Sequence, residues 1–197
     1  MINKLIILLL LLLGNNLYSQ CNGVQSFNLN PTPVNNSYAP GTVVTICYTM
    51  VGYNMISVNW LEGFDLTLGN GWVNVTPLSP PNNCGGNNSG GNWVWGNTVT
   101  ASATGLQFGP GYFFDLSNDG NPGNDFGDQG SCTWSFCFNA TVSPNNCNPQ
   151  SLLVQVTAGG DGTMGSWINN SCALVPFTIF NGTISPVIPN LGLITHN

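Results

Sequence analysis

The alternation that decides the fold runs from Cys132 to Val142 and reads CTWSFCFNATV. Every second position holds an apolar side chain, namely Trp134, Phe136, Phe138 and Ala140. The positions between them hold Ser, Cys, Asn and Thr. Because successive side chains of a β-strand point to opposite faces, this pattern predicts a strand with one buried and one solvated face.

Similar strand signals recur along the chain, and Gly, Pro and Asn separate them. These residues interrupt every stretch long enough to hold a helix, and no window has helical periodicity. Many short strands with such turns predict one all-β domain, an antiparallel immunoglobulin-like β-sandwich stapled by disulfides. The expected strands are Val24–Leu29, Thr42–Val51, Met55–Leu61, Trp72–Val75, Asn92–Trp95, Thr98–Ala103, Tyr112–Leu116, Cys132–Val142, Leu152–Thr157 and Ala173–Phe180.

The 197 residues divide into three expected parts. Residues 1–19 are typical of a secretory signal peptide, because Lys4 precedes the unbroken apolar run Leu5–Leu13. As a helix this run spans about 13 Å, too short for the hydrocarbon core of about 30 Å, so no membrane span is expected. Residues 20–183 form the sandwich domain and residues 184–197 a C-terminal tail. The chain is therefore expected to be secreted or displayed at the cell surface.

The charge balance excludes several classes of protein. The chain has one Lys or Arg, Lys4, against seven acids, and charged residues make up only 4% of it. Binding to nucleic acid or to an anionic membrane surface needs clustered Lys and Arg, so neither is expected. Neutral polysaccharides or surface proteins remain as expected partners. Enzymes that clamp phosphates or carboxylates with cations are disfavoured for the same reason.

The cysteines predict disulfides, since an exported chain meets an oxidising environment. No C-x-x-C spacing occurs and the only histidine, His196, lies near the C-terminus, so a zinc site is not expected. The seven cysteines are Cys21, Cys47, Cys84, Cys132, Cys137, Cys147 and Cys172.

Pattern suggests three pairs among these cysteines. Cys47 and Cys137 each alternate with apolar neighbours, so both are expected on the polar faces of neighbouring strands. Cys147 and Cys172 flank one hairpin-like unit and form the second expected pair. Elimination then leaves Cys84 with Cys132.

This pairing leaves Cys21 without a partner. A lipid anchor at Cys21 is the less favoured alternative to secretion. Lipidation signals prefer Leu three residues before the cysteine and a small residue directly before it, where this chain has Tyr18 and Gln20.

An acidic loop is the candidate metal site. Four of the seven acids fall between residues 115 and 128, and Asn residues lie between them. Calcium takes about six to eight oxygen ligands, which carboxylates, amides and backbone carbonyls of a Gly-rich loop supply. The alternative is a metal-free loop built of Asx-turns. The candidate ligands are Asp115, Asp119, Asn121, Asp125 and Asp128.

Two tryptophans are the candidate ligand-binding residues. Trp93 and Trp95 share one face of a short strand beside the Asn- and Gly-rich loop Asn82–Gly91. Exposed aromatic rings stack on the apolar faces of sugars without needing a cation. The alternative for this pair is core packing, which the alternation already assigns to Trp134.

Catalysis has little support in the sequence, and the protein is expected not to be an enzyme. No histidine lies inside the domain to serve as base for a Ser or Cys nucleophile. Glu62 with Asp65 is a conceivable glycosidase pair, but residues three apart on a strand face opposite ways.

Several motifs together resemble a module of secreted surface proteins from gliding bacteria of the Bacteroidota type. They are NWLEG (59–63), LGNGW (68–72), WVW (93–95), GPGYFF (109–114), DGNPGNDFGD (119–128) and WSFCF (134–138). The resemblance covers roughly residues 21–180. It implies a surface or extracellular module and no particular chemistry.

The favoured function is therefore a non-catalytic secreted or cell-surface structural or adhesion module. A calcium-assisted carbohydrate-binding module is the first alternative. A carboxylate-based glycoside hydrolase is the second.

Overall fold

The computed structural model describes residues 21, 23–53, 59–130, 132–144, 150–168, 172 and 174–185. The expected signal peptide, Cys147, His196 and the tail from residue 186 lie outside this part of the chain.

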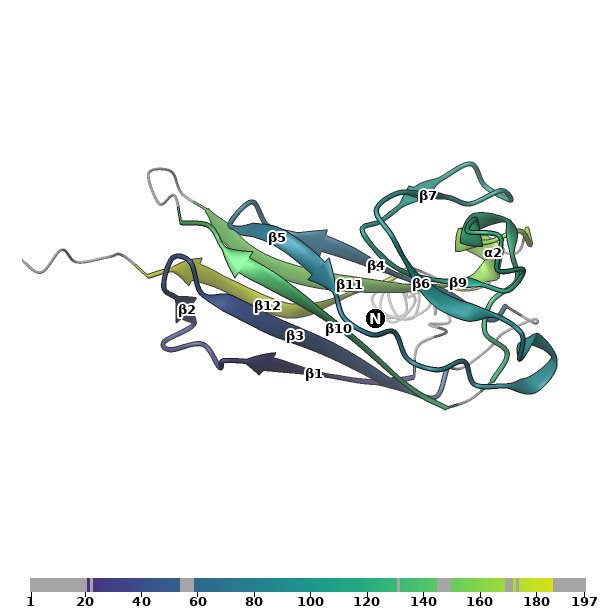
Figure 1. Ribbon diagram of the computed structural model, residues 1–197, viewed down its shortest axis with the longest axis horizontal. Helices are drawn as coiled ribbons and strands as arrows, with labels where there is room; N and C mark the ends of the chain where they lie inside the picture. Colours follow the sequence, from purple (N-terminus) through teal and green to yellow (C-terminus); the bar gives the residue numbers. More distant parts are fainter. Residues whose placement is uncertain are drawn as a thin grey trace, which may run out of the picture.

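Two sheets run along the long axis of the molecule (Figure 1). The first sheet has the order β1 (Val24–Asn30), β3 (Val43–Val51), β10 (Thr133–Val142) and β5 (Trp72–Pro77). The second has the order β2 (Ser37–Tyr38), β12 (Pro176–Ile184), β11 (Ser151–Gly160), β4 (Leu61–Leu68), β9 (Gly111–Asp115) and β6 (Asn92–Gly96). Neighbouring strands are antiparallel except β2 and β12.

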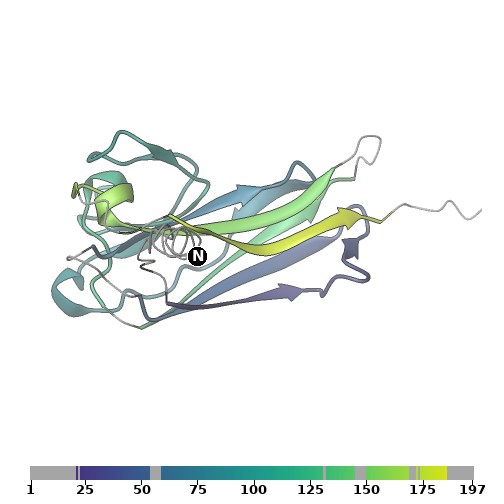
Figure 2. The same ribbon diagram turned by 180° about the vertical axis from the view of Figure 1, so that it is seen from behind.

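Short elements complete the chain: the hairpin of β7 (Val99–Thr100) and β8 (Gln107–Phe108), and the helical turns η1 (Gly86–Asn88), η2 (Pro122–Asn124) and α2 (Asp161–Met164). Figure 2 shows α2 at one end of the molecule and the tip of β12 at the other. The loop that follows β9 also lies at the α2 end (Figure 1).

The apolar positions of the alternation in β10 form a buried face. Trp134, Phe136, Phe138 and Ala140 are all at most 3% exposed. Phe136 meets Phe64 of the opposite sheet with ring centroids 3.9 Å apart. Burying aromatic side chains between two sheets removes a large apolar area from water and stabilises the fold. The expected all-β, antiparallel, disulfide-bonded architecture is confirmed.

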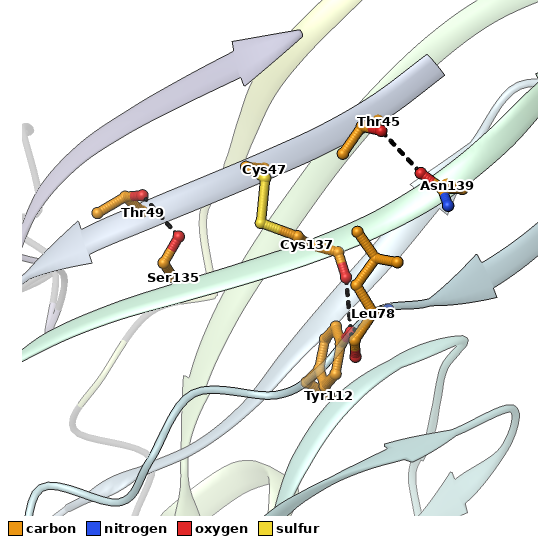
Figure 3. The surroundings of a disulfide bond; sticks show 8 residues. All are labelled: Thr45, Cys47, Thr49, Leu78, Tyr112, Ser135, Cys137 and Asn139. Carbon is orange, nitrogen blue, oxygen red and sulfur yellow. Dashed lines mark hydrogen bonds between the residues drawn. A yellow bond between two sulfur atoms is a disulfide. The ribbon is translucent and has the colours of Figure 1, made fainter. Parts of the chain in front are cut away.

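The disulfide between Cys47 and Cys137 lies where the alternation predicts. The two residues are directly opposed in the register of β3 and β10, with Cα atoms 4.1 Å apart. Figure 3 shows it between two cross-strand hydrogen bonds on the same face: Thr45 Oγ1 to Asn139 Oδ1 (2.8 Å) and Thr49 Oγ1 to Ser135 Oγ (3.2 Å). This bridge joins strands of one sheet, whereas the conserved bridge of antibody domains joins two sheets. The immunoglobulin-like assignment stays a prediction.

Of the other two predicted disulfides, one is confirmed and one is wrong. The Cys84–Cys132 pair is confirmed, but the pairing of Cys172 with Cys147 is wrong, because Cys172 bonds to Cys21 with Cα atoms 5.3 Å apart. Cys21 precedes β1 and Cys172 precedes β12, and both strands begin at the same end of the molecule (Figure 2). Since this bond occupies the sulfur of Cys21, that sulfur is not available for a lipid thioether.

Residues 55–58 of the strand expected at Met55–Leu61 lie outside the described part of the chain, and β4 starts at Leu61. The strand expected at Thr98–Ala103 is too long, because β7 covers only Val99–Thr100. In the described part of the chain, no helix is long and apolar enough to cross a membrane.

Candidate functional site

The loop between β9 and β10 is fixed to two neighbouring elements by backbone hydrogen bonds. The Asp128 amide donates to the Leu61 carbonyl at 2.8 Å, and the Ser166 amide donates to the Asp125 carbonyl at 2.9 Å. Gly165 permits the second approach, because a Cβ there would lie 2.5 Å from the Asp125 oxygen. The acidic residues of the loop are therefore held against β4 and the residues that follow α2.

Three of the predicted calcium ligands come together. Carboxylate oxygens of Asp115, Asp119 and Asp125 all lie within 4.8 Å of one another. Asp115 accepts the amides of Asp119 (3.2 Å) and Gly120 (2.9 Å), and Asp125 accepts the amide and hydroxyl of Ser117 at 3.3 and 3.2 Å. Burial, reinforced by the adjacent Asp115 carboxyl, raises the pKa of Asp125. A divalent cation placed here would relieve the repulsion between these charges.

Asp128 and Asn121 have other roles in the structure. Asp128 is 1% exposed, and its Oδ2 accepts the indole N–H groups of Trp134 at 2.8 Å and Trp93 at 3.1 Å. It also accepts the Cys84 amide at 3.0 Å. Asp128 therefore lies outside the group of carboxylates that Asp115, Asp119 and Asp125 form, and its oxygens serve these buried donors. Asn121 is exposed, and its amide donates to Asp119 Oδ1 at 2.8 Å.

Two further buried acids lie at this end. Asp161 begins α2 and accepts the amides of Trp60 at 3.1 Å and Gly127 at 3.4 Å. Glu62 of β4 is fully buried, and neither carboxylate oxygen has a hydrogen-bond partner among the described residues. Burial, and then the charges of Asp161 and the loop acids, raise the pKa of Glu62 well above its usual range.

Glu62 and Asp65 do not form a pair of carboxylates that solvent can reach. Glu62 is closed off from solvent, and Asp65 accepts the Gly109 amide at 2.5 Å. A substrate therefore cannot reach Glu62 in this conformation.

In metal-free buffer we expect the protein to lose stability as the pH rises from 5 to 7. Burial raises the pKa of Asp161 from 3.8 to about 6, and that of Glu62 above 4.5, so in this window the native state binds more protons than the unfolded chain. The stability from proton binding is complete below the unfolded pKa values and is lost as the pH rises through the folded ones. We expect a loss of about 1–3 kcal/mol, measured by denaturation in chelator at each pH. A Glu62→Gln variant should show a shallower dependence, and a slope equal to that of the wild type would contradict this assignment.

The expected aromatic platform is not exposed. Trp93 is 2% exposed and packs on Phe136 with ring centroids 4.8 Å apart, so it cannot stack on a ligand. Trp95 is half-buried against Tyr112, and its indole donates to Asn97 Oδ1 at 3.0 Å. Both rings belong to the inner face of β6, as the core alternative states.

A different aromatic group faces solvent at the α2 end. Trp60, Phe126 and Trp167, with Asn88, line a cavity of about 340 Å³, which we call the aromatic pocket. Phe126 is 42% and Trp167 44% exposed, and the Phe126 ring lies 6.3 Å from that of Trp60 and 6.5 Å from that of Trp167. Sequence reasoning missed this group, because its members come from three distant segments that only the fold joins.

The aromatic pocket and the acidic residues are positioned by the same segments of the backbone. Phe126 directly follows Asp125, and the Trp60 amide donates to Asp161. The Asn88 side chain donates to the Gly127 carbonyl at 2.6 Å, which fixes the backbone beside Phe126.

Comparison with protein-family models, with curated proteins and with solved structures finds no match to this chain. The structure itself defines the class: an all-β protein of two main sheets, antiparallel except for the β2–β12 pair, with three disulfides among its described residues. Disulfides of this number are typical of proteins that fold in an oxidising environment.

Proposed function

We propose that the protein is a secreted or cell-surface adhesion module, without catalytic activity, that contacts a neutral saccharide through the aromatic pocket. The observation that carries the proposal is the solvent-facing group of Trp60, Phe126 and Trp167 at one end of a disulfide-bonded scaffold. Aromatic faces stack on the C–H faces of sugar rings. Within the pocket, the Phe126 ring packs against both Trp60 and Trp167.

The charge of the chain favours a neutral ligand. Lys4 is the only Lys or Arg, and seven acids give the protein a net negative charge, so anionic polymers are repelled. The cavity of about 340 Å³ lies within the range of about 300–1,000 Å³ that is typical of small-molecule sites. The apolar run after Lys4 and the resemblance to Bacteroidota surface modules favour an extracellular setting.

Binding to an array of neutral polysaccharides tests this function. Against a glycan bound by the wild type, we expect Trp167→Ala and Phe126→Ala each to weaken binding at least about tenfold, because loss of a contact aromatic removes about 1.4 kcal/mol or more. Both side chains are more than 40% exposed, so the melting temperature should change little.

Phe27→Ala is the matched control. Phe27 is 47% exposed but lies on β1 of the other sheet, so its replacement should leave glycan binding unchanged. Absence of binding to every neutral glycan, or equal effects of all three substitutions, would contradict the saccharide site and leave a purely structural role as the better account.

A further inference from the structure

A groove opens between the two sheets on the side of the molecule where β1 and β12 lie. Its volume is about 440 Å³, and the apolar side chains that line it are Phe27, Leu29, Pro33, Ile179 and Phe180. Figure 2 shows β1 and β12 along this side, and the Phe27 ring lies 6.2 Å from the Phe177 ring. We call this feature the edge groove, because each of the two strands has an open edge beside it.

The backbones of both strands are open to a further strand at the edge groove. Among the described residues β1 pairs only with β3. In the same part of the chain β2 pairs with β12 only at Thr183 and Ile184, so residues 178–181 of β12 have no neighbouring strand on that side. Unpaired amides and carbonyls at a sheet edge are a template for pairing with an added strand.

β1 lacks the features that protect an edge strand. Edge strands are commonly blocked by charged side chains, proline or a β-bulge. β1 reads VQSFNLN (24–30), without a charge or proline, and its register with β3 is continuous over all seven residues. Phe27 is 47% exposed although it lies opposite the buried Tyr48 in this register. The edge of β1 is therefore suited to pairing with another segment.

The sequence that follows β12 has the pattern of such a segment. Residues 186–195 read PVIPNLGLIT and carry no charge. When segment 190–195 is extended, Leu191 and Leu193 share one face, and the positions on either side of Leu191 hold Asn and Gly. Pro189 directly precedes the segment, and proline is tolerated at the start of a strand. Six residues in a strand span about 20 Å, which is close to the length of β1.

We propose that segment 190–195 of one copy of the chain adds to the edge of β1 in a second copy and fills its edge groove. Leu191 and Leu193 then contact the apolar side chains of the groove, and their removal from water stabilises the contact. Neither the segment nor the lining of the groove carries a charge, so no ion loses its hydration. Head-to-tail contacts of this kind produce open chains or closed rings of copies.

The direction of the chain after β12 favours a second copy over the same one. The Ser185 amide donates to the Tyr38 carbonyl at 2.8 Å, so the chain continues past β2 as it leaves β12. The edge groove lies behind this point, along residues 178–181. Ser185 and Ile188 each precede a proline, which favours extended backbone there. An immediate reversal into the groove of the same copy is disfavoured for this reason.

Sedimentation of the disulfide-bonded protein over a range of concentrations tests the assembly. A Cys147→Ser background prevents a disulfide between copies, because the other six cysteines are paired. We expect the average mass at least to double between about 1 µM and about 100 µM. The double substitution Leu191→Ser and Leu193→Ser should remain a single copy over the same range.

A synthetic peptide of residues 186–195 tests the groove itself. It should bind to the Leu191→Ser, Leu193→Ser protein, whose groove is free. Thr178→Lys, added to that protein, places a charge in the groove and should weaken peptide binding at least about tenfold. Asn28→Lys does the same from the β1 side of the groove. Both residues are exposed, so the melting temperature should change little.

Thr100→Lys is the matched control, since Thr100 is also exposed but lies on β7, outside the groove, and its replacement should leave the association unchanged. A single copy at every concentration of the wild type overturns the proposal. Unweakened peptide binding in both groove variants overturns it too. So does a lower melting temperature of the double serine variant without a change of mass, because the segment would then bind its own copy. Thr178→Lys should keep the affinity of the aromatic pocket for the glycan, so the two proposals fail separately.

Discussion

Replacement of Asp128 by alanine is expected to lower the free energy of unfolding by about 3–5 kcal/mol. The substitution leaves the indole N–H groups of Trp93 and Trp134 and the amide of Cys84 without their acceptor. Unpaired buried donors are costly, and the removed carboxylate leaves a cavity beside two tryptophans. Denaturant unfolding followed by tryptophan fluorescence measures this loss directly. The melting temperature should fall by about 10 °C.

Asp119→Ala in chelator provides the control for this prediction. Asp119 belongs to the same loop but is exposed, so its loss should change stability by no more than about 0.5 kcal/mol. If Asp128→Ala were as mild as Asp119→Ala, Asp128 would not be the buried acceptor that joins the loop to the core.

Removal of the Cys47–Cys137 disulfide is the second change with a large expected effect. The bond closes a loop between residues 90 apart, and its loss in the double alanine variant should cost about 2–4 kcal/mol. The loss arises chiefly because the unfolded chain gains conformational freedom. The melting temperature should fall by about 5–15 °C, measured by calorimetry with the other two disulfides intact.

The adjacent pair Thr49 and Ser135 supplies a matched control. Its hydroxyls meet at 3.2 Å on the same face of the same two strands (Figure 3). Replacing both by alanine removes one exposed hydrogen bond and should cost less than about 1 kcal/mol. A cost equal to that of the cysteine variant would show that the covalent bond adds nothing to this strand pair.

A residue of the second sheet also contacts the strand that carries this disulfide (Figure 3). The Tyr112 hydroxyl from the second sheet lies 2.6 Å from the Cys137 carbonyl and 3.0 Å from the Leu78 amide that donates to it. The strand that carries the disulfide is thus tied to both sheets.

The alternation of apolar and polar residues along single strands predicted the buried face of β10 and the position of one disulfide. In β10 the side-chain period of two specifies which residues are buried, and the same rule placed Cys47 and Cys137 on the solvated face. By contrast, the bond between Cys21 and Cys172 joins residues 151 apart. Only the order of strands in the sheets brings those residues together, and a pattern read along the chain does not contain that order.

In the candidate site, too, the sequence predicted the residues of one segment but not those that the fold brings together. Asp115, Asp119 and Asp125 were predictable because one short loop carries them. The buried acids Glu62 and Asp161 were not predicted to lie near this loop, since they come from β4 and α2. Asp161 meets the loop by accepting the Gly127 amide. A glutamate inside the strand sequence LEGF (61–64) is the signal that could have identified Glu62, because strands rarely bury an unpaired acid.

The aromatic residues show why burial is harder to predict than periodicity. Trp93 and Trp95 do share one face of β6, as alternation requires, but the sequence does not say which face is inward. In the structure the Trp93 ring packs on Phe136, and its indole donates to Asp128, both of which lie in other segments.

The Cys21–Cys172 bond has a mechanical consequence. Tension applied between the start of β1 and the end of β12 passes through the sulfur–sulfur bond, so the covalent ring of residues 21–172 cannot lengthen. Among the strands, only β12 follows the ring, and its nine residues span about 30 Å. Such tension would therefore peel this one strand first, while the aromatic pocket inside the ring kept its shape.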